Sequence, residues 1–266
     1  MINISFNLKI IEYESTREVE YRFYEKPITF KSELDPDKEI EKPAAKLNCN
    51  SEIERIIKSE RSLSESLRRT KSMIYSHGRA NVWEWFVTYT FDPKKINSTD
   101  YDAVYSYLSE HLKNIRKRKC PNMKYLVVPE YHADGSKFHF HALMSNIDEL
   151  DFIDSGIKVK GKIKWNINNF KAGFTTALRI GDGESARTSN YMSKYITKTL
   201  VYHTKNRQRY LISKNLDKPI IDEYMLDSEE LEKLRKELHE KTTSAKVVEV
   251  DSGSYTNRIE YINIKL

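Results

Sequence analysis

The chain is poor in cysteine, with only Cys49 and Cys120 among its 266 residues. Neither cysteine lies in a CxxC or CxxH pattern, so the sequence indicates neither a zinc finger nor a disulfide framework. Such sparing use of cysteine fits a reducing, cytoplasmic setting.

Long apolar runs are also missing. No run approaches the roughly 20 residues that a membrane-spanning helix needs, so we expect no membrane partner. The segment 1–11 has no apolar core and no cleavage site, and we therefore expect no signal peptide. The sequence contains no GxxxxGK[ST] phosphate loop, which excludes a helicase or ATPase domain of that type within it.

Charge is plentiful but only slightly unbalanced. The chain has 45 Lys and Arg against 39 Asp and Glu, a formal net charge of +6 and an isoelectric point of about 9.0. A basic excess suits a partner with a phosphate backbone, but many other proteins reach this value. Hydrophobic residues make up 39% of the chain, which is enough for a substantial core.

Strand and helix patterns alternate along the chain. Stretches rich in β-branched and aromatic residues predict strands at 2–13, 18–30, 83–91, 125–132, 137–145, 157–167 and 174–180, with a closing hairpin at 246–250 and 258–264. Apolar residues at helical spacing predict helices at 51–76, from about 100 to 119, at 184–200 and at 227–241. Asn50 is expected to cap the first helix, and Gly78 to end it.

These elements predict an α+β protein with an antiparallel sheet, because hairpins are prominent. We divide the chain into N-terminal strands and a charged linker (1–50), a core (51–219) and a C-terminal helix and hairpin (220–266). The two ends are expected to add strands or a DNA-binding surface. One continuous domain is the alternative.

A candidate metal site lies in the strands around Asp134-Gly135. His139 and His141 are two residues apart in a strand and therefore face the same side. A two-residue turn at Asp134-Gly135 pairs Glu130 with His139, which places their Cβ atoms ~5 Å apart on one face. Glutamate and imidazole ligands can hold Mg²⁺, Mn²⁺ or Zn²⁺.

Two alternatives to this site stay open. An HxH pair by itself is more often an ordinary exposed pair in a strand. Pro129 cannot donate a hydrogen bond within a sheet, so it can mark a bulge. A bulge would shift the register and bring His132 to the site in place of Glu130.

The segment 191–198 (YMSKYITK) contains two interleaved YxxK units. On a continuous helix Tyr191 and Tyr195 share one face, as do Lys194 and Lys198. A phenol is a weak nucleophile near neutral pH, and a nearby cation helps it to attack. Two packed tyrosines beside solvated lysines are the simpler interpretation of this short and common pattern.

Three motifs nevertheless stand in order: FVTYTFDP (86–93), the segment 137–143 with His139-Phe140-His141, and YMSKYITK (191–198). Together they resemble the three motifs of HUH-superfamily rolling-circle replication initiators. The context VPEYHADGSKFHFHALMS and the segment 209–216 are most similar to the phage and plasmid Rep proteins of low-GC bacteria. The resemblance runs from about Leu67 to Pro219.

The resemblance implies the HUH endonuclease fold, a central antiparallel sheet flanked by helices, with the tyrosine helix beside the HUH strand. It implies an enzyme that nicks and rejoins single-stranded origin DNA through a 5′-phosphotyrosine link, with Mg²⁺ or Mn²⁺ as cofactor. The implied metal ligands are Glu130, His139 and His141. The implied catalytic residues are Tyr191, Tyr195, Lys194 and Lys198, and the sequence does not decide which tyrosine attacks.

The resemblance also implies partners and a place. These are single-stranded or hairpin origin DNA, and a host helicase and polymerase, in the cytoplasm of a bacterial host. The motif 86–93 is expected to support the site, with Thr88 and Thr90 near DNA. The alternatives are a transposase or relaxase with the same chemistry, a non-catalytic origin-binding protein, and a zinc hydrolase built on the HxH motif.

Overall fold

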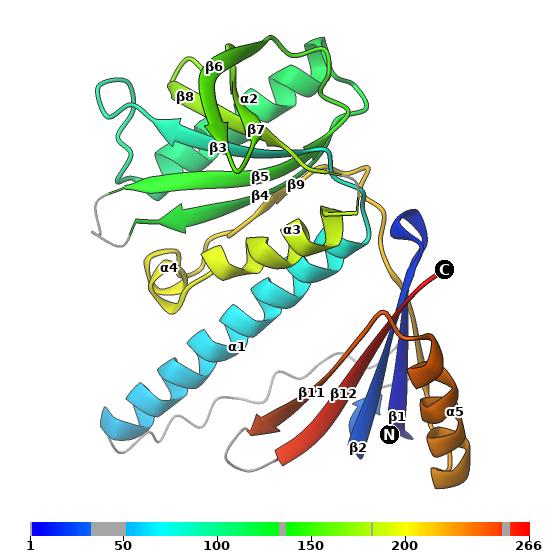
Figure 1. Cartoon of the computed structure of the whole chain (residues 1–266). Coiled ribbons are helices and arrows are strands. Elements are labelled where there is room, and N and C mark those ends of the chain that lie inside the picture. The colour runs from blue at the N-terminus through cyan, green and yellow to red at the C-terminus, as the bar shows by residue number, and fades with distance from the viewer. Residues whose placement is uncertain (1, 33–51, 133–136, 182, 252–255) are drawn as a thin grey trace. The chain divides into compact units, whose positions relative to one another are not determined.

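The structure, a computed structural model, describes residues 2–32, 52–132, 137–181, 183–251 and 256–266. The chain forms two compact units, one of residues 1–49 with 219–266 and one of residues 50–218 (Figure 1). Both ends of the chain therefore contribute to the same unit. The proposed cap Asn50, most of the expected linker and the Asp134-Gly135 turn lie outside the described residues.

The unit built from the two ends is a five-stranded antiparallel sheet in the order β10-β1-β2-β12-β11. Its strands are β1 (Ile2–Tyr13), β2 (Glu18–Ser32), β10 (Ile220–Tyr224), β11 (Ser244–Asp251) and β12 (Thr256–Lys265). The two expected hairpins are confirmed, whereas β10 was not predicted. Its residues are all exposed, so it shows no alternation of apolar and polar positions.

Helix α5 (Ser228–Lys241) packs on this sheet as an amphipathic helix. A capping box of Asp227 and Glu230 begins the helix. Leu238 is buried with Leu8 and Phe23 from the sheet. The helix predicted at 227–241 is confirmed.

The larger unit has a seven-stranded antiparallel sheet in the order β6-β7-β8-β3-β5-β4-β9. The strands are β3 (Trp85–Phe91), β4 (Lys124–Tyr131), β5 (Phe138–Ser145), β6 (Phe152–Val159), β7 (Lys162–Ile167), β8 (Gly173–Arg179) and β9 (Leu211–Ile212). The protein is thus α+β with antiparallel sheets, as predicted.

Helices cover both faces of this sheet. Helix α2 (Tyr101–Arg118) lies on one face, and α1 (Glu52–Arg79), α3 (Ser185–Met192) and α4 (Lys198–His203) lie on the other (Figure 1). Strand β3 alternates accordingly, because Trp85, Val87, Tyr89 and Phe91 are buried in the main core while the residues between them are only half-buried. We call the face that carries these half-buried β3 residues the site face. No helix among the described residues is long and apolar enough to span a membrane.

Two local predictions were wrong. The single strand expected at 157–167 is the hairpin of β6 and β7, which reverses at Lys160 (φ 49°) and Gly161 (φ 79°). Two consecutive positive φ angles are what a tight hairpin turn requires, and Lys160 gave no sign of this in the sequence. Gly78 does not end α1, which continues to Arg79.

Gly78 is instead a contact point between α1 and α3. A Cβ atom added at Gly78 would lie 2.9 Å from the Cβ of Ser189. The Ser189 hydroxyl donates to the Gly78 carbonyl at 2.8 Å. The missing side chain therefore lets α3 approach α1 closely.

Candidate active site

The pairing of β4 with β5 places Glu130 directly opposite His139, as the turn arithmetic predicts. The register continues without a shift through Pro129, so the bulge considered above does not occur. His141 lies two residues further along on the same face. Its Nε2 donates to a carboxylate oxygen of Glu130 at 2.7 Å. One carboxylate and two imidazoles thus gather on the site face.

Two threonines of β3 hold the imidazoles from the other side. Thr88 is paired with His141 and Thr90 with His139 across the β3–β5 ladder. The Thr88 Oγ1 lies 3.1 Å from Nδ1 of His141, and the Thr90 Oγ1 lies 3.2 Å from Nδ1 of His139. A hydroxyl can donate or accept, so each threonine can serve either tautomer of its histidine. Both rings are thereby held with Nδ1 occupied and Nε2 turned away from β3.

The electrostatics favour an ionised glutamate beside neutral imidazoles. The hydrogen bond from His141 holds the pKa of Glu130 below its usual range. Burial, assisted by the neighbouring His132, lowers the pKa of His139 to about 4. Near neutral pH, Glu130 is therefore a carboxylate and His139 a neutral imidazole, which are the forms that bind metal ions.

His132 remains close to the cluster although the register keeps Glu130 in place. Its ring lies 4.3 Å from the ring of His139, centroid to centroid. The sequence analysis considered His132 only as a substitute for Glu130. The structure places it beside the cluster as an additional imidazole.

The tyrosine segment differs from the continuous helix predicted at 184–200. Helix α3 ends at Met192, a 3₁₀ turn follows at Ser193–Tyr195, and α4 begins at Lys198. Ile196 and Thr197 are extended between them, and the Thr197 side chain accepts from the backbone N–H of Leu200. Thr197 is thus an N-cap that starts a new helix, which hydrophobic periodicity alone does not reveal.

The break brings Tyr195 onto the histidine cluster. Its ring stacks on that of His141, with centroids 3.8 Å apart and planes inclined by 17°. Tyr191 meets Tyr195 edge-on at 5.3 Å and lies 6.5 Å from the ring of Phe86. Burial, together with a hydrogen bond to Tyr191, raises the pKa of Tyr195 well above its usual value. The Tyr195 phenol is therefore protonated near neutral pH.

The two lysines are separated by the same break. Lys194 lies over the ring of Tyr191, with Nζ 5.0 Å from the ring centroid. Lys198 is the exposed first residue of α4 and does not share a helix face with Lys194. The expectation of two lysines stacked one turn apart was wrong, because Thr197 interrupts the helix.

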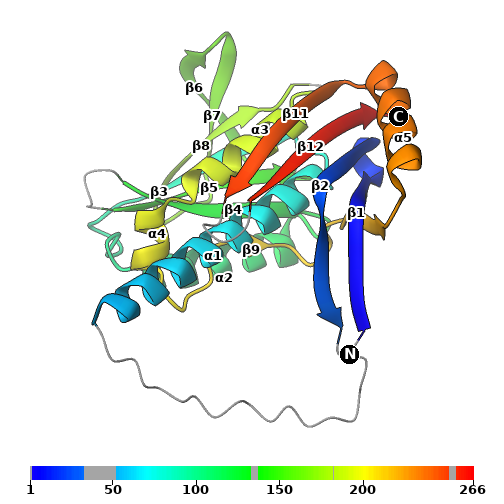
Figure 2. The same cartoon turned by 90° about the horizontal axis from the view of Figure 1, so that it is seen from below.

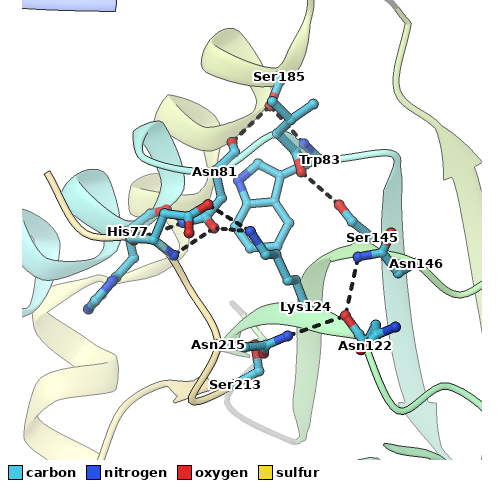
Figure 3. Close-up of polar contacts among 12 residues, drawn as sticks. His77, Asn81, Trp83, Asn122, Lys124, Ser145, Asn146, Ser185, Ser213 and Asn215 are labelled. Atoms are coloured by element: carbon cyan, nitrogen blue, oxygen red, sulfur yellow. Dashed lines mark hydrogen bonds and ion pairs between the residues drawn. The ribbon is translucent and has the colours of Figure 1, made fainter. Parts of the chain in front are cut away.

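A buried polar network fixes the elements that carry the tyrosines (Figure 3). Asn81, which is fully buried, accepts from Lys124 Nζ at 3.3 Å and from the backbone N–H of Asp217 at 3.0 Å. Ser185, at the start of α3, accepts from the backbone N–H of Trp83 at 3.0 Å. The network joins the ends of α1, α3 and β4, and the sequence analysis missed it because its members are far apart in the chain.

The donor set of the cluster fits a divalent cation chemically. A carboxylate and two neutral imidazoles with engaged Nδ1 atoms are usual ligands of Mn²⁺ and related metals. Within the described ranges, however, no group of three His, Cys, Asp or Glu side chains is already arranged to hold a metal ion. The hydrogen bond between Glu130 and His141 instead closes the cluster.

Comparison with known proteins gives one match. No curated protein and no solved structure matches the chain. Residues 84–200 match the model of one protein family and span less than half of the chain. This region runs from the start of β3 into α4 and includes every candidate site residue. The matching family is described as replication-associated protein ORF2, and the match supports a role in the initiation of replication.

Proposed function

We propose that this chain is a rolling-circle replication initiator with an HUH endonuclease fold, which nicks and rejoins single-stranded origin DNA. The observation that carries the proposal is the stacking of Tyr195 on His141, 3.8 Å between centroids. This contact sets a phenol against a cluster of Glu130, His139 and His141. The family match of residues 84–200 gives the role in replication its independent support.

In the proposed reaction, the phenol oxygen of Tyr195 attacks the scissile phosphorus. The new bond joins tyrosine to the 5′-phosphate, and the bond from phosphorus to the 3′-oxygen breaks. The products are a 5′-phosphotyrosine link and a free 3′-hydroxyl, which a polymerase can extend. Attack on the phosphotyrosine by a 3′-hydroxyl reverses the bond changes and reseals the strand.

Tyr195 must lose its proton during this attack, because its raised pKa keeps the phenol neutral beforehand. Tyr191 is hydrogen-bonded to Tyr195 and is 46% exposed, so it provides a path for the proton to solvent. We therefore assign the first attack to Tyr195. Tyr191 relays the proton and serves as the second nucleophile in rejoining, while Lys194 beside it stabilises developing negative charge.

Glu130, His139 and His141 would hold Mg²⁺ or Mn²⁺, with Thr88 and Thr90 orienting the imidazoles. When bound, such a cation polarises a non-bridging phosphate oxygen and neutralises the charge that develops on it. Lys198, exposed at the start of α4, would contact the phosphate backbone of the bound strand.

The target would be single-stranded or hairpin DNA, whose bases are accessible for contacts. The sequence has no phosphate loop, so the proposal assigns unwinding to a host helicase and extension to a host polymerase, in the bacterial cytoplasm.

The proposal is tested by mixing the protein with single-stranded DNA tiled from its own replicon, with Mn²⁺ or with EDTA. A slower band on a denaturing protein gel reports the covalent adduct. We expect a metal-dependent adduct that Tyr195→Phe abolishes, whereas Tyr191→Phe keeps the first nick and loses rejoining. Tyr202→Phe is the matched control, because Tyr202 is 67% exposed in α4 and belongs to no part of the cluster.

Absence of an adduct on every tile, with DNA binding retained, would favour a non-catalytic origin-binding protein. Tightly bound zinc and hydrolysis that survives the Tyr191→Phe, Tyr195→Phe double change would favour a hydrolase. A transposase or relaxase would give the same adduct, and the fate of the nicked strand in cells distinguishes it from a replication initiator.

A further inference from the structure

The hairpin of β6 and β7 extends beyond the body of its sheet. Only Lys164 and Trp165 of β7 are paired with β8, and the remaining pairs of β7 are with β6 alone. The hairpin projects away from the other strands of this sheet (Figure 2). Two strands joined by a tight turn at Lys160-Gly161 therefore form a narrow ribbon exposed to solvent.

Four lysines lie within seven residues at the end of this ribbon. They are Lys158, Lys160, Lys162 and Lys164. The register opposes Lys158 to Ile163 and Lys162 to Val159, so Lys158 faces one side and Lys162 the other. Lys164 shares the side of Lys162, and Lys160 occupies the turn at the tip. Positive charge thus surrounds the end of the ribbon.

Little negative charge balances these lysines. Lys162 is paired with Glu184 at 2.5 Å. Across the described ranges, no ion pair joins an acidic side chain to Lys158, Lys160 or Lys164. The end of the ribbon is therefore a net positive surface.

The ribbon also exposes apolar side chains on one side. Ile153 is 49% exposed, Ile157 is 53% exposed and Val159 is 39% exposed. They oppose Asn166, Lys164 and Lys162 and so share their side. Apolar surface beside lysines on an element that projects into solvent indicates a binding surface.

The ribbon's two aromatic residues are not free to stack on DNA bases. Phe152 stacks on Trp85 with centroids 4.4 Å apart, and Trp165 meets Phe152 edge-on at 6.5 Å. Both pack against the main core. Single-stranded DNA is bound chiefly by aromatic stacking in a basic groove, and this ribbon lacks available aromatic rings.

Charge on both sides and at the tip fits a groove whose two walls are both lined with phosphates. The major groove of double-stranded DNA has such walls and is wide enough to admit a two-stranded β-ribbon. An acidic protein surface would require cations on one side only. The exposed isoleucines and valine match the sugar and thymine-methyl surface inside the groove.

We propose that the β6–β7 ribbon enters the major groove of duplex DNA next to the nicking site. The inference rests on the proposed function for its biological setting. The site face connects the ribbon to the tyrosines, because Lys164 is paired with Leu178 of β8 and Leu178 with Phe86 of β3. Phe86 in turn contacts Tyr191. DNA held by the ribbon and a strand at the tyrosines would lie on one continuous face.

The test uses the full chain with Lys158→Gln and Lys160→Asn combined, since asparagine tolerates the positive φ of residue 160. Fluorescence anisotropy measures binding to a mixed-sequence duplex of about 20 base pairs and to one of its strands, over a range of salt concentrations. The control combines Lys233→Gln and Lys236→Gln, which removes two exposed lysines from α5. Circular dichroism checks that both variants are folded.

We expect the ribbon variant to bind the duplex about tenfold more weakly, with a log affinity–log salt slope shallower by about 2, because each phosphate contact contributes about 0.9. Binding of the single strand, and the control variant, should change little. An unchanged slope on duplex, an equal loss on the single strand, or an equal loss in the control would overturn the proposal.

Adduct formation on a short single-stranded target separates the two proposals. The ribbon variant should form the tyrosine adduct at the wild-type level on this target, because no duplex is involved. If even the wild-type protein forms no adduct, nicking fails as the function, and the duplex measurement still decides whether the ribbon binds DNA.

Discussion

The ring of Tyr195 stacks on that of His141, and Thr88 binds the opposite edge of the same imidazole through Nδ1. His141 is therefore fixed between a strand residue and the candidate nucleophile. The contact depends on the break between α3 and α4, because the 3₁₀ turn at Ser193–Tyr195 carries the phenol to the sheet. The following predictions derive from this arrangement and from the packing around it.

Replacing either β3 threonine by valine should weaken metal binding. Valine keeps the β-branched shape but cannot hold Nδ1 of the imidazole, and loss of such supporting contacts commonly lowers metal affinity by about 10-fold to 100-fold. Calorimetric titration with Mn²⁺ measures the loss in Thr88→Val and in Thr90→Val. Serine at either position should restore most of the affinity.

Thr176→Val is the matched control for this experiment. Thr176 is paired with Thr88 from β8, so it lies on the same face without an imidazole opposite it in the ladder. Equal loss of Mn²⁺ affinity in Thr176→Val, or none in the β3 variants, would show that the threonines do not orient the ligands.

Acidification should destabilise the protein through His111. This histidine of α2 packs among the rings of Tyr89, Tyr107 and Phe170, and burial lowers its pKa to about 4. The unfolded chain takes up the proton near pH 6.5, whereas the folded state resists it until about pH 4. The stability that His111 contributes is complete above pH 6.5 and is lost progressively as the pH falls toward 4.

Thermal unfolding measured between pH 7 and pH 4 tests this linkage. His111→Gln, which carries no titratable group, should lose less thermal stability than the wild type over that range. Identical pH dependence in the two proteins would mean that His111 is not held neutral in the folded state.

A side chain at Gly78 should push α3 away from α1. Alanine at an ordinary helix position gains about 1 kcal/mol over glycine, but here its Cβ would meet the Cβ of Ser189 at 2.9 Å. We expect the clash to dominate, giving a net destabilisation of about 1–3 kcal/mol. Urea unfolding measures the change, and adduct formation should fall with it, since α3 carries Tyr191.

A double-mutant cycle identifies the cause. Ser189→Gly removes the atom that the new methyl group meets, so Gly78→Ala should cost less in that background. If the cost of Gly78→Ala is the same with Ser189 or glycine at position 189, the close approach of the two helices is not what requires the glycine.

Much of the cluster was readable from the sequence because it depends on local geometry. The spacing around Asp134-Gly135 sets the β4–β5 register, and the structure pairs Glu130 with His139 as that register requires. The contacts from Thr88 and Thr90 were not derivable in the same way. They depend on the pairing of β3 with β5, which no short turn connects.

The errors have equally specific causes. The predicted helix at 184–200 ignored Thr197, whose capping hydrogen bond to Leu200 starts a second helix. The union of the two chain ends in one sheet was missed because β1 meets β10 across more than 200 residues, and pairings at such separation leave no local pattern. The ribbon was read as one strand because the backbone reversal at Lys160 has no asparagine or aspartate to mark it.

The most direct test of the central claim is to map the attachment site of a covalent DNA adduct. Lys194 separates the two tyrosines, so trypsin places Tyr191 in peptide 188–194 and Tyr195 in peptide 195–198. After Mn²⁺-dependent reaction and nuclease trimming, mass spectrometry should find the first nucleotide adduct on peptide 195–198. An adduct formed first on peptide 188–194, or no nucleotide on either peptide, would contradict the assignment of Tyr195 as the nucleophile.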